Sequence, residues 1–387
     1  MISKEKILNV VPYKLKEARL SRGYTSTALA ELFGLQKQTI SKYELGQCNP
    51  SSDVVEKYCR ILNFPIEYFL NDENEIKGKS AVFFRSLKSA DSQIREEIKT
   101  RLIWTNRIYQ HTNNFIEYPP LNLPDLGELL NDELDIYKIE EIATSLRDYW
   151  KLGDEPIKNL AMTLELNGIV LCVSNIAETN VDACSQTIND TAIFFIRRND
   201  ISACRLRFDL AHELGHLILH SAITKEEMQC KEVLDRVEKE ANMFASAFLL
   251  PRDKFGKEVL SISLDHFINL KSRWKVSISA MIYRCSELGI FNEAQVLYLR
   301  KAISAKKWRK IEPLDDIIIR EKPNLIANAI KIIIEQGLET KHLLKSLFKL
   351  SSDDITQLFD LPNDYLKDAE EIKLNIKSNI LPFPLNS

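Results

Sequence analysis

The chain has 387 residues, of which 45% are hydrophobic and 28% are charged, and its formal net charge is −3. This length and composition predict a globular protein of two or more domains. No stretch reaches the roughly 18 consecutive apolar residues of a membrane span, and the amino terminus "MISKEKILNVVPYK" has no apolar core of signal-peptide length. We therefore expect a cytoplasmic protein with no membrane partner.

The cysteines agree with this expectation, because none of them forms a C-x-x-C pair. They are Cys48, Cys59, Cys172, Cys184, Cys204, Cys230 and Cys285. We interpret them as reduced, buried thiols of a cytosolic protein.

The stretch "TSTALAELFGLQKQTISKYELGQCNPS" predicts two short helices joined by a sharp turn. Thr25 can cap the first helix, Gly34 permits the turn, and the second helix follows from about residue 36 to 44. Ala30 and Ile40 fall where a helix-turn-helix needs a small contact residue and a buried apolar anchor. From Val11 to about Leu70 the sequence resembles the XRE (phage-repressor-like) family, which implies a DNA-binding domain over residues 1–71.

The second helix of this pair carries the candidate DNA contacts. The residues that the resemblance places at the major groove are Gln36, Lys37, Gln38 and Thr39. Glutamine can pair with adenine and lysine can reach guanine, so these residue types suit base readout. Lys42, Ser26 and Asn49 are better placed for phosphate contacts. Residues 1–70 carry a net charge of +3, which fits a double-stranded DNA operator as partner; the alternative is a small helical bundle used for protein contacts.

A connector and two strands follow this domain. Residues 72–138 combine helical apolar spacing through Ile94, Ile98 and Leu102 with a later proline-rich, acidic stretch. The runs "GIVLCVSN" (168–175) and "TAIFFIRRN" (191–199) predict strands, because they are β-branched and aromatic and are bounded by turn residues. One of these strands could offer its edge to an extended peptide.

The stretch "RFDLAHELGHLILH" (207–220) contains three of the six histidines on one apolar helix. His212 and His216 are one turn apart, so they project from the same face and can share a metal ion. Glu213 lies roughly 100° round the helix, which suits a general base acting on a water at the metal. The expected ion is Zn²⁺. The alternative is a set of structural core histidines.

A third ligand is needed, and the helical stretch "RVEKEANMFASAFLLP" (236–251) offers Glu238 and Glu240. Glu238 shares a face with small or hydrogen-bonding residues, among them Asn242, which could accept a hydrogen bond from a ligating imidazole. Glu240 shares its face with bulky apolar side chains. We therefore favour Glu238 and keep Glu240 as the alternative. His220 has drifted about 80° round the helix from His212, so we expect a supporting role for it rather than ligation.

From about Ile139 to Trp308, with "RFDLAHELGHLILH" and "EKEANMFASAFLLP" as its core motifs, the sequence resembles the ImmA/IrrE family of zinc-dependent peptidases. Known members of that family cleave helix-turn-helix repressors. The resemblance implies His212, His216 and one glutamate as zinc ligands and Glu213 as the base. It does not decide between Glu238 and Glu240. Arg205 and Arg207 are expected to form ion pairs, and Cys184, on an expected loop, could inhibit the metal as a thiolate.

Near the carboxyl terminus, "TKHLLKSLFKLSSDDITQLF" (340–359) echoes residues 25–44 at a constant offset of 315. Lys345 and Lys349 replace Ala30 and Gly34, and Asp353 and Asp354 would repel phosphate. We interpret the echo as chance similarity of two amphipathic helices, with an interaction module as the alternative.

Together these patterns predict a multidomain fold: an all-α helix-turn-helix domain, an α+β zincin-like domain and a helical carboxyl-terminal region. The expected boundaries are 1–71 for the DNA-binding domain, 72–138 for a helical connector, 139–308 for the peptidase domain and 309–387 for the last region. The expected function is a transcriptional regulator that controls a mobile-element, stress or toxin–antitoxin operon by regulated proteolysis of a repressor or toxin. The alternative is a non-proteolytic repressor or antitoxin whose zincin domain senses or binds a partner. The chain is a possible homodimer.

Overall fold

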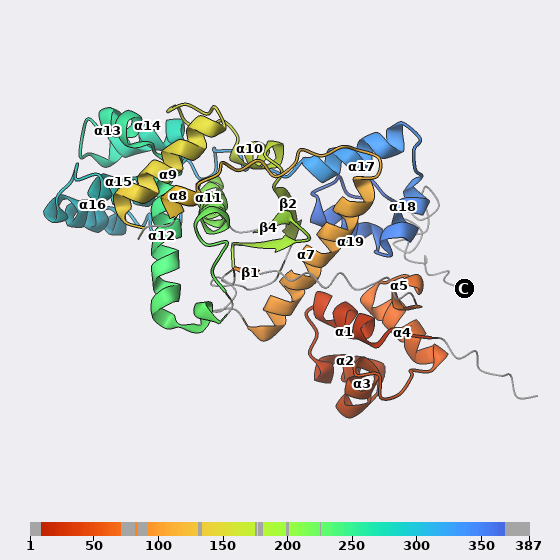
Figure 1. The fold of residues 1–387 in the computed structure, drawn as a ribbon. Coiled ribbons are helices and arrows are strands. Elements are labelled where there is room, and N and C mark those ends of the chain that lie inside the picture. Colours follow the sequence, from red (N-terminus) through yellow and green to blue (C-terminus); the bar gives the residue numbers. More distant parts are fainter. Residues whose placement is uncertain are drawn as a thin grey trace, which may run out of the picture.

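A four-stranded sheet lies between two hydrophobic cores (Figure 1). The computed structural model describes residues 9–70, 82–83, 91–130, 134–174, 176, 181–198, 201–224 and 226–367. The strand order is β1-β3-β4-β2. The strands are β1 (Val82–Phe83), β2 (Val170–Ser174), β3 (Ala183–Ile188) and β4 (Thr191–Arg197). β2 and β4 run parallel, whereas β3 is antiparallel to both of its neighbours. The two strands predicted from the sequence are confirmed as β2 and β4, and β3 was not expected.

The alternation of side chains along β2 and β4 explains why the sheet faces two cores. Leu171 of β2 and Phe194 of β4 point into the first core, whereas their neighbours Cys172 and Phe195 point into the second. All four side chains are fully or almost fully buried. A sheet covered on both faces favours continuous apolar strands, which is the pattern of these two segments.

The first core is built between the sheet and the middle helices of the chain, which Figure 1 shows on the left. These helices are α8 (Gly127–Leu130), α9 (Ile136–Tyr149), α10 (Leu160–Leu166), α11 (Ala203–Leu219), α12 (Lys231–Leu249), α13 (Arg252–Glu258), α14 (Leu264–Trp274), α15 (Ile278–Glu287) and α16 (Glu293–Ala305). A 3-10 turn, η1 (Glu227–Gln229), precedes α12. Lys275 ends α14 in the left-handed conformation, and α15 follows after a short turn.

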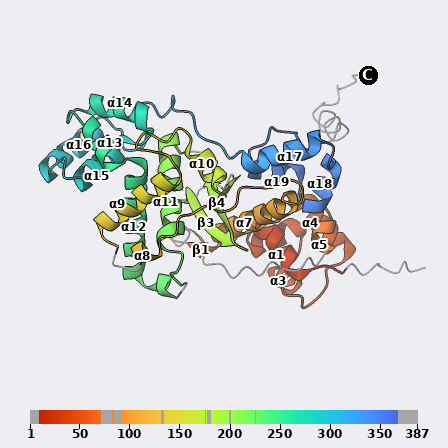
Figure 2. The same cartoon turned by 45° about the horizontal axis from the view of Figure 1, so that its top comes forward.

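The second core joins the two ends of the described chain on the other face of the sheet. Its amino-terminal helices are α1 (Pro12–Ser21), α2 (Ser26–Phe33), α3 (Lys37–Glu44), α4 (Ser52–Leu62) and α5 (Glu67–Leu70). The long helix α7 (Ser92–Thr112) and the helices α17 (Leu325–Glu335), α18 (Lys341–Phe348) and α19 (Ser352–Leu358) complete it. The amino-terminal helices therefore share one hydrophobic core with α7 and the carboxyl-terminal helices (Figure 2).

The three helices α17–α19, here called the carboxyl-terminal unit, contain a second helix-turn-helix. α18 and α19 begin at positions 315 residues after the starts of α2 and α3. Thr340 caps α18 as Thr25 caps α2, and Lys349 adopts the left-handed conformation (φ 54°) that Gly34 has (φ 68°). Ile355 is as buried as Ile40. Both segments therefore have the same local backbone geometry, and the interpretation of the echo as chance similarity of two amphipathic helices stays an interpretation.

The carboxyl-terminal unit holds the amino-terminal domain through a buried carboxylate. Asp354, at the start of α19, accepts two hydrogen bonds from Arg22, at 2.6 and 2.7 Å, and one from Arg101 of α7, at 3.2 Å. Arg101 also donates to the carbonyl oxygen of Ser21 at 2.8 Å. These contacts join parts of the chain that are up to 332 residues apart.

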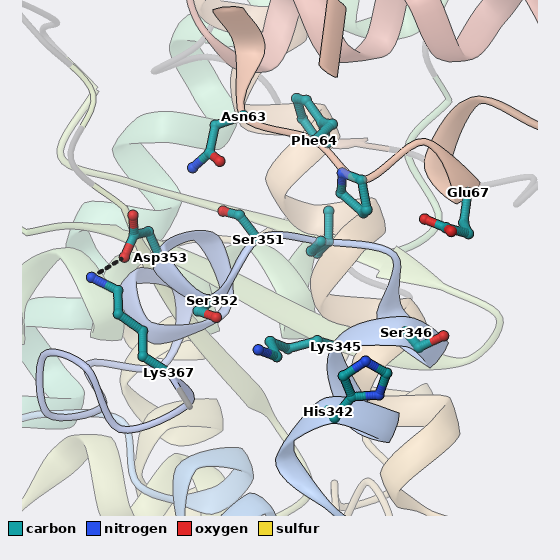
Figure 3. A pocket seen from close by; sticks show the side chains of 12 residues that line it. Asn63, Phe64, Glu67, His342, Lys345, Ser346, Ser351, Ser352, Asp353 and Lys367 are labelled. Atoms are coloured by element: carbon teal, nitrogen blue, oxygen red, sulfur yellow. Dashed lines mark ion pairs between the residues drawn. The ribbon is translucent and has the colours of Figure 1, made fainter. Parts of the chain in front are cut away.

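A cleft of about 710 Å³ lies beside this junction. Figure 3 shows Asn63 and Phe64 of the amino-terminal domain on one side of it and Lys345 of α18 on the other. Lys367 forms an ion pair with Asp353 at 3.3 Å across its carboxyl-terminal wall. The cleft therefore lies between the α4–α5 corner of the amino-terminal domain and the carboxyl-terminal unit.

The chain is thus multidomain and mostly helical, with a helix-turn-helix domain, a region with a small sheet and a helical carboxyl-terminal region, as the sequence predicts. The boundaries drawn between these parts stay a prediction. Within the described residues, no helix combines the length and the apolarity that crossing a bilayer requires.

Candidate metal centre and nucleic-acid interface

Helix α11 presents the two histidines of the metal motif side by side. Ser202 caps its first turn, and the Nε2 atoms of His212 and His216 lie 3.0 Å apart. Gly215 lies between the histidines at the crossing with α12, where a Cβ atom would stand 3.1 Å from Phe244 and 3.3 Å from Ala241. The absence of a side chain at this glycine therefore lets α12 approach the histidines closely.

Helix α12 brings Glu238 to the pair. Its carboxylate oxygens lie 3.4 Å from Nε2 of His212 and 3.2 Å from Nε2 of His216. The three side chains offer ligand atoms that all lie within 4.8 Å of one another. Only 16% of the His212 side chain and 12% of the Glu238 side chain are exposed, so solvent reaches the group through a small opening.

Glu240 lies elsewhere, although it is only two residues further along α12. Its Oε2 atom is 2.9 Å from Nε2 of His220, whose Nδ1 atom is 3.0 Å from Nδ1 of His216. These contacts determine where the protons lie. The carboxylate of Glu240 can only accept, so His220 donates to it from Nε2. Nδ1 of His220 then accepts the hydrogen bond that Nδ1 of His216 donates. This arrangement leaves a lone pair on Nε2 of His216, the atom that faces Glu238.

His212 is oriented in the same way by a different partner. Its Nδ1 atom is 3.0 Å from Oδ1 of Asn242, one turn after Glu238 on α12. Because an amide oxygen accepts, His212 donates from Nδ1 and keeps a lone pair on Nε2. Both imidazoles are thus held with their Nε2 atoms toward the same point, which is the usual preparation of histidines for a metal.

The electrostatics agree with this proton assignment for His216. Burial lowers the pKa of His216 to about 3, so its imidazole is neutral at physiological pH. Burial would raise the pKa of Glu238, but the adjacent imidazoles of His212 and His216 bring that pKa well below the ordinary value. A neutral imidazole and an ionised carboxylate are the forms in which His216 and Glu238 bind a metal. Burial lowers the pKa of His212, but the carboxylates of Glu238, Glu213 and Asp209 raise it above its ordinary value.

Glu213 lies beside this group but does not belong to it. The hydroxyl of Ser185, on the unexpected strand β3, donates to Oε2 of Glu213 at 2.5 Å. Burial raises the pKa of the Glu213 carboxyl to about 7, while the neighbouring His212 and the hydrogen bond from Ser185 oppose the rise. Its pKa therefore lies near neutrality, where a carboxylate can accept a proton and give it back.

Three other side chains that the sequence analysis considered near the metal site, those of Arg205, Arg207 and Cys184, have partners away from it. Arg205 forms an ion pair with Asp182 at 2.5 Å, and Arg207 is paired with Glu321, so both arginines are engaged as expected. Cys184 lies on β3 and not on a loop, and it packs in the second core, away from the face of Ser185. The idea that its thiolate reaches the metal is wrong, because successive side chains of a strand point to opposite faces.

The helix-turn-helix has the local geometry that its sequence predicts. The Thr25 hydroxyl accepts from the Ala28 amide at 3.0 Å, and Gly34 ends α2 in the left-handed conformation. Arg19 of α1 donates two hydrogen bonds to Glu44 at the end of α3, at 2.6 and 2.8 Å, in a buried ion pair. This ion pair and the fully buried Ile40 hold the inner face of α3 against the rest of the amino-terminal domain.

The opposite face of α3 carries the candidate DNA contacts. Gln36, Lys37, Gln38 and Lys42 are exposed, and Thr39 is half-buried. α3 lies on the outer side of the amino-terminal domain, away from the carboxyl-terminal unit (Figures 1 and 2). A duplex could therefore meet this face while the contacts of Arg22 with Asp354 stay in place.

A fold and two sites of this kind define a DNA-binding regulator with a zincin-like domain. Comparisons with known proteins agree: residues 15–69 match the helix-turn-helix family, and residues 164–286 match the IrrE N-terminal-like domain. A helix-turn-helix transcriptional regulator of Archaeoglobus fulgidus is 36% identical over 67 residues, which are 17% of this chain and 96% of that protein. The chain belongs to the XRE-type helix-turn-helix transcriptional regulators and carries an IrrE/ImmA-like domain.

Two relatives from Bacillus subtilis match the amino-terminal part. The regulator ImmR is 28% identical over 85 residues, which are 22% of this chain and 67% of ImmR. The SPbeta prophage-derived regulator YonR is 32% identical over 70 residues, which are 18% of this chain and 59% of YonR. All three likenesses concern DNA-binding regulators and extend over about a fifth of this chain.

Proposed function

We propose that this protein is a DNA-binding transcriptional regulator whose second site is a zinc-dependent peptidase. In this proposal His212, His216 and Glu238 hold the zinc ion, and Glu213 is the general base. The observation that carries it is the meeting of two oriented imidazoles and one carboxylate, contributed by two helices, beside a second carboxylate that stays free of them. Two nitrogens and one oxygen are a donor set that leaves zinc a position for water.

Zinc at this position would supply Lewis acidity for the attack of a water on a peptide carbonyl. Glu213 takes a proton from the attacking water and returns it to the leaving amine. Ser185 fixes the carboxylate of Glu213 for this transfer through its 2.5 Å hydrogen bond. The small exposed fractions of His212 and Glu238 favour an extended, narrow substrate over a folded surface.

The first site directs this activity to DNA. Gln36, Lys37, Gln38 and Thr39 would read the bases of an operator, and Lys42 would contact its phosphates. We expect the operator to belong to a mobile element, a stress response or a toxin–antitoxin pair, because one relative is prophage-derived. The substrate or partner in this account is a repressor or toxin protein in the cytoplasm, and the regulator itself is a possible homodimer.

Substitution of Glu213 tests the peptidase directly. Glu213→Gln keeps the size of the side chain and can keep the hydrogen bond with Ser185, but it cannot accept the proton. Hydrolysis of candidate partner proteins by the zinc-loaded chain should fall by about 10²–10⁴-fold, as followed by mass spectrometry, with zinc content and DNA affinity unchanged. Glu232→Gln, at an exposed position on α12, is the matched control and should retain full activity.

The same variant distinguishes the proposed function from the alternative. If Glu213→Gln represses its operator and responds to the inducing signal as the unchanged protein does in cells, cleavage is not how the protein signals. The zincin domain would then be a sensor or binding module of a non-proteolytic repressor or antitoxin.

A further inference from the structure

The edge of strand β3 beside Glu213 is occupied by a segment of the same chain. β3 pairs with β4 on one side and with β1 on the other (Figure 2). In the β1 pairing, which is antiparallel, Phe83 lies opposite Ser185 and Val82 opposite Gln186. Ser185 is the residue whose hydroxyl donates to Glu213. The backbone of Phe83 is therefore next to a residue that touches the proposed base.

This position is where an extended peptide would bind. Peptides commonly bind by adding a strand to an open sheet edge, because the unpaired amide and carbonyl groups of the edge supply main-chain hydrogen bonds. The added strand then lies about 4.8 Å from the edge strand. β4 pairs with one edge of β3. A peptide from another molecule could therefore pair only with the other edge, which β1 occupies in this structure.

We propose that this chain is its own substrate, and that the site hydrolyses a peptide bond at or next to Val82–Phe83. The proposal rests on the peptidase function proposed above and names a substrate for it: an extended segment paired antiparallel with β3. In the reaction the carbon–nitrogen bond of one peptide group breaks, the hydroxyl of a water goes to the carbonyl carbon, and its remaining proton goes to the amine. No oxidant, reductant or further reactant is needed.

The location of this bond gives the reaction a regulatory consequence. Residues 82–83 lie between α5, which ends the DNA-reading domain, and α7, which begins the rest of the second core. One cut there ends the covalent link between the DNA-reading domain and the metal centre. The two pieces stay joined only by contacts such as Arg22 with Asp354 and Trp104 with Glu17, so the cut makes their separation possible.

The test uses the full chain, freed of metal with a chelator and then supplied with Zn²⁺. Denaturing mass spectrometry, which separates pieces that stay associated, should find two fragments whose junction lies within residues 71–90. The fraction cut at a given time should not change over a tenfold range of protein concentration, because the substrate is in the same chain. Glu213→Gln should show no cut while binding zinc normally.

A second variant tests the pairing itself. Proline at both positions, Val82→Pro with Phe83→Pro, removes whichever of the two amides the added strand directs at β3, since successive N–H groups of a strand point to opposite edges. The cut should be lost, whereas hydrolysis of unfolded casein supplied as a separate substrate should continue. The double alanine variant, Val82→Ala with Phe83→Ala, keeps both amides and should still be cut.

Three results would overturn the proposal. Zinc- and Glu213-dependent hydrolysis of casein with an intact connector would refute self-cleavage and leave the peptidase function standing. A cut outside residues 71–90, or a cut fraction that rises with protein concentration, would refute the assigned substrate position. If neither casein nor the chain itself is cut, the peptidase function fails and the proposal fails with it.

Discussion

The candidate DNA-contacting helix α3 and the candidate metal-binding helix α11 differ in how far their functional side chains are exposed. Most of those of α3 are exposed to solvent, whereas most of those of α11 are buried. On α3 the candidate contacts Gln38 and Lys42 are exposed, and the residues that hold the fold, such as Ile40, are separate from them. On α11 the candidate ligand His216 and the candidate base Glu213 are themselves 3% and 4% exposed. A DNA reader meets a large ligand at its surface, whereas a metal centre must exclude bulk water.

The difference has a consequence for substitutions. Removing an exposed side chain from α3 should change DNA binding and leave stability within about 0.5 kcal/mol. Removing a buried one from the metal centre breaks a hydrogen-bonded set, so function and stability should change together. Each of the following predictions tests one side of this contrast.

The largest effect is expected at the metal ligands. His216→Ala removes one of three proposed ligands and should lower zinc affinity by more than about 100-fold, whereas Asn242→Ala removes only the partner of His212 and should lower it about 10- to 100-fold. Competition with a zinc chelator measures both values. Equal losses from the two variants would mean that His216 supports the site and does not bind the ion.

The next effect is expected at the reading helix. Gln38→Ala should cost about 1–3 kcal/mol of discrimination at one base position. Lys42→Ala should weaken binding to every sequence and reduce the slope of log affinity against log salt by about 1. Binding titrations over a salt series check both, with the melting temperature as the control. A Lys42→Ala protein with altered base preference and an unchanged salt slope would reverse the two roles.

The smallest effect concerns the turn that supports the reading helix. Gly34 has φ +68°, and a Cβ atom added there would meet no other atom within 4 Å. Gly34→Ala is therefore strained only in its backbone, which costs about 1–2 kcal/mol of unfolding free energy. Gly34→Asn is the matched control, because asparagine tolerates this conformation better. Chemical denaturation measures the difference. Alanine and asparagine variants of equal stability would show that the turn does not need its left-handed residue.

The sequence predicts the elements whose patterns are local. The helices around His212 and Thr25 follow from caps, turns and apolar spacing, and β2 and β4 follow from apolar runs. The choice of Glu238 over Glu240 also had a local basis, since residues two apart on a helix point to different sides. The structure places Glu238 beside both histidines and Glu240 beside His220, which is the arrangement that the small neighbours of Glu238 favoured.

The features that the sequence does not reveal depend on partners far away in the chain. β3 has the small and polar sequence "ACSQTI", and its pairing with β4 and β1 makes it a strand, so Ser185 could not be expected beside Glu213. The contact of Arg22 with Asp354 spans 332 residues. The two acidic residues of α19 indicated that this helix would repel phosphate, but not that one of them would hold the amino-terminal domain.

The central claim, that His212, His216 and Glu238 form a zinc site, is tested most directly by the zinc content of two variants on the same helix. The unchanged chain should carry about one zinc per molecule by elemental analysis. Glu238→Gln should lose most of it, whereas Glu240→Gln, which alters only the partner of His220, should keep most of it. Loss of zinc from Glu240→Gln together with full retention in Glu238→Gln would contradict the assignment, and an unchanged chain that binds no zinc would contradict the site itself.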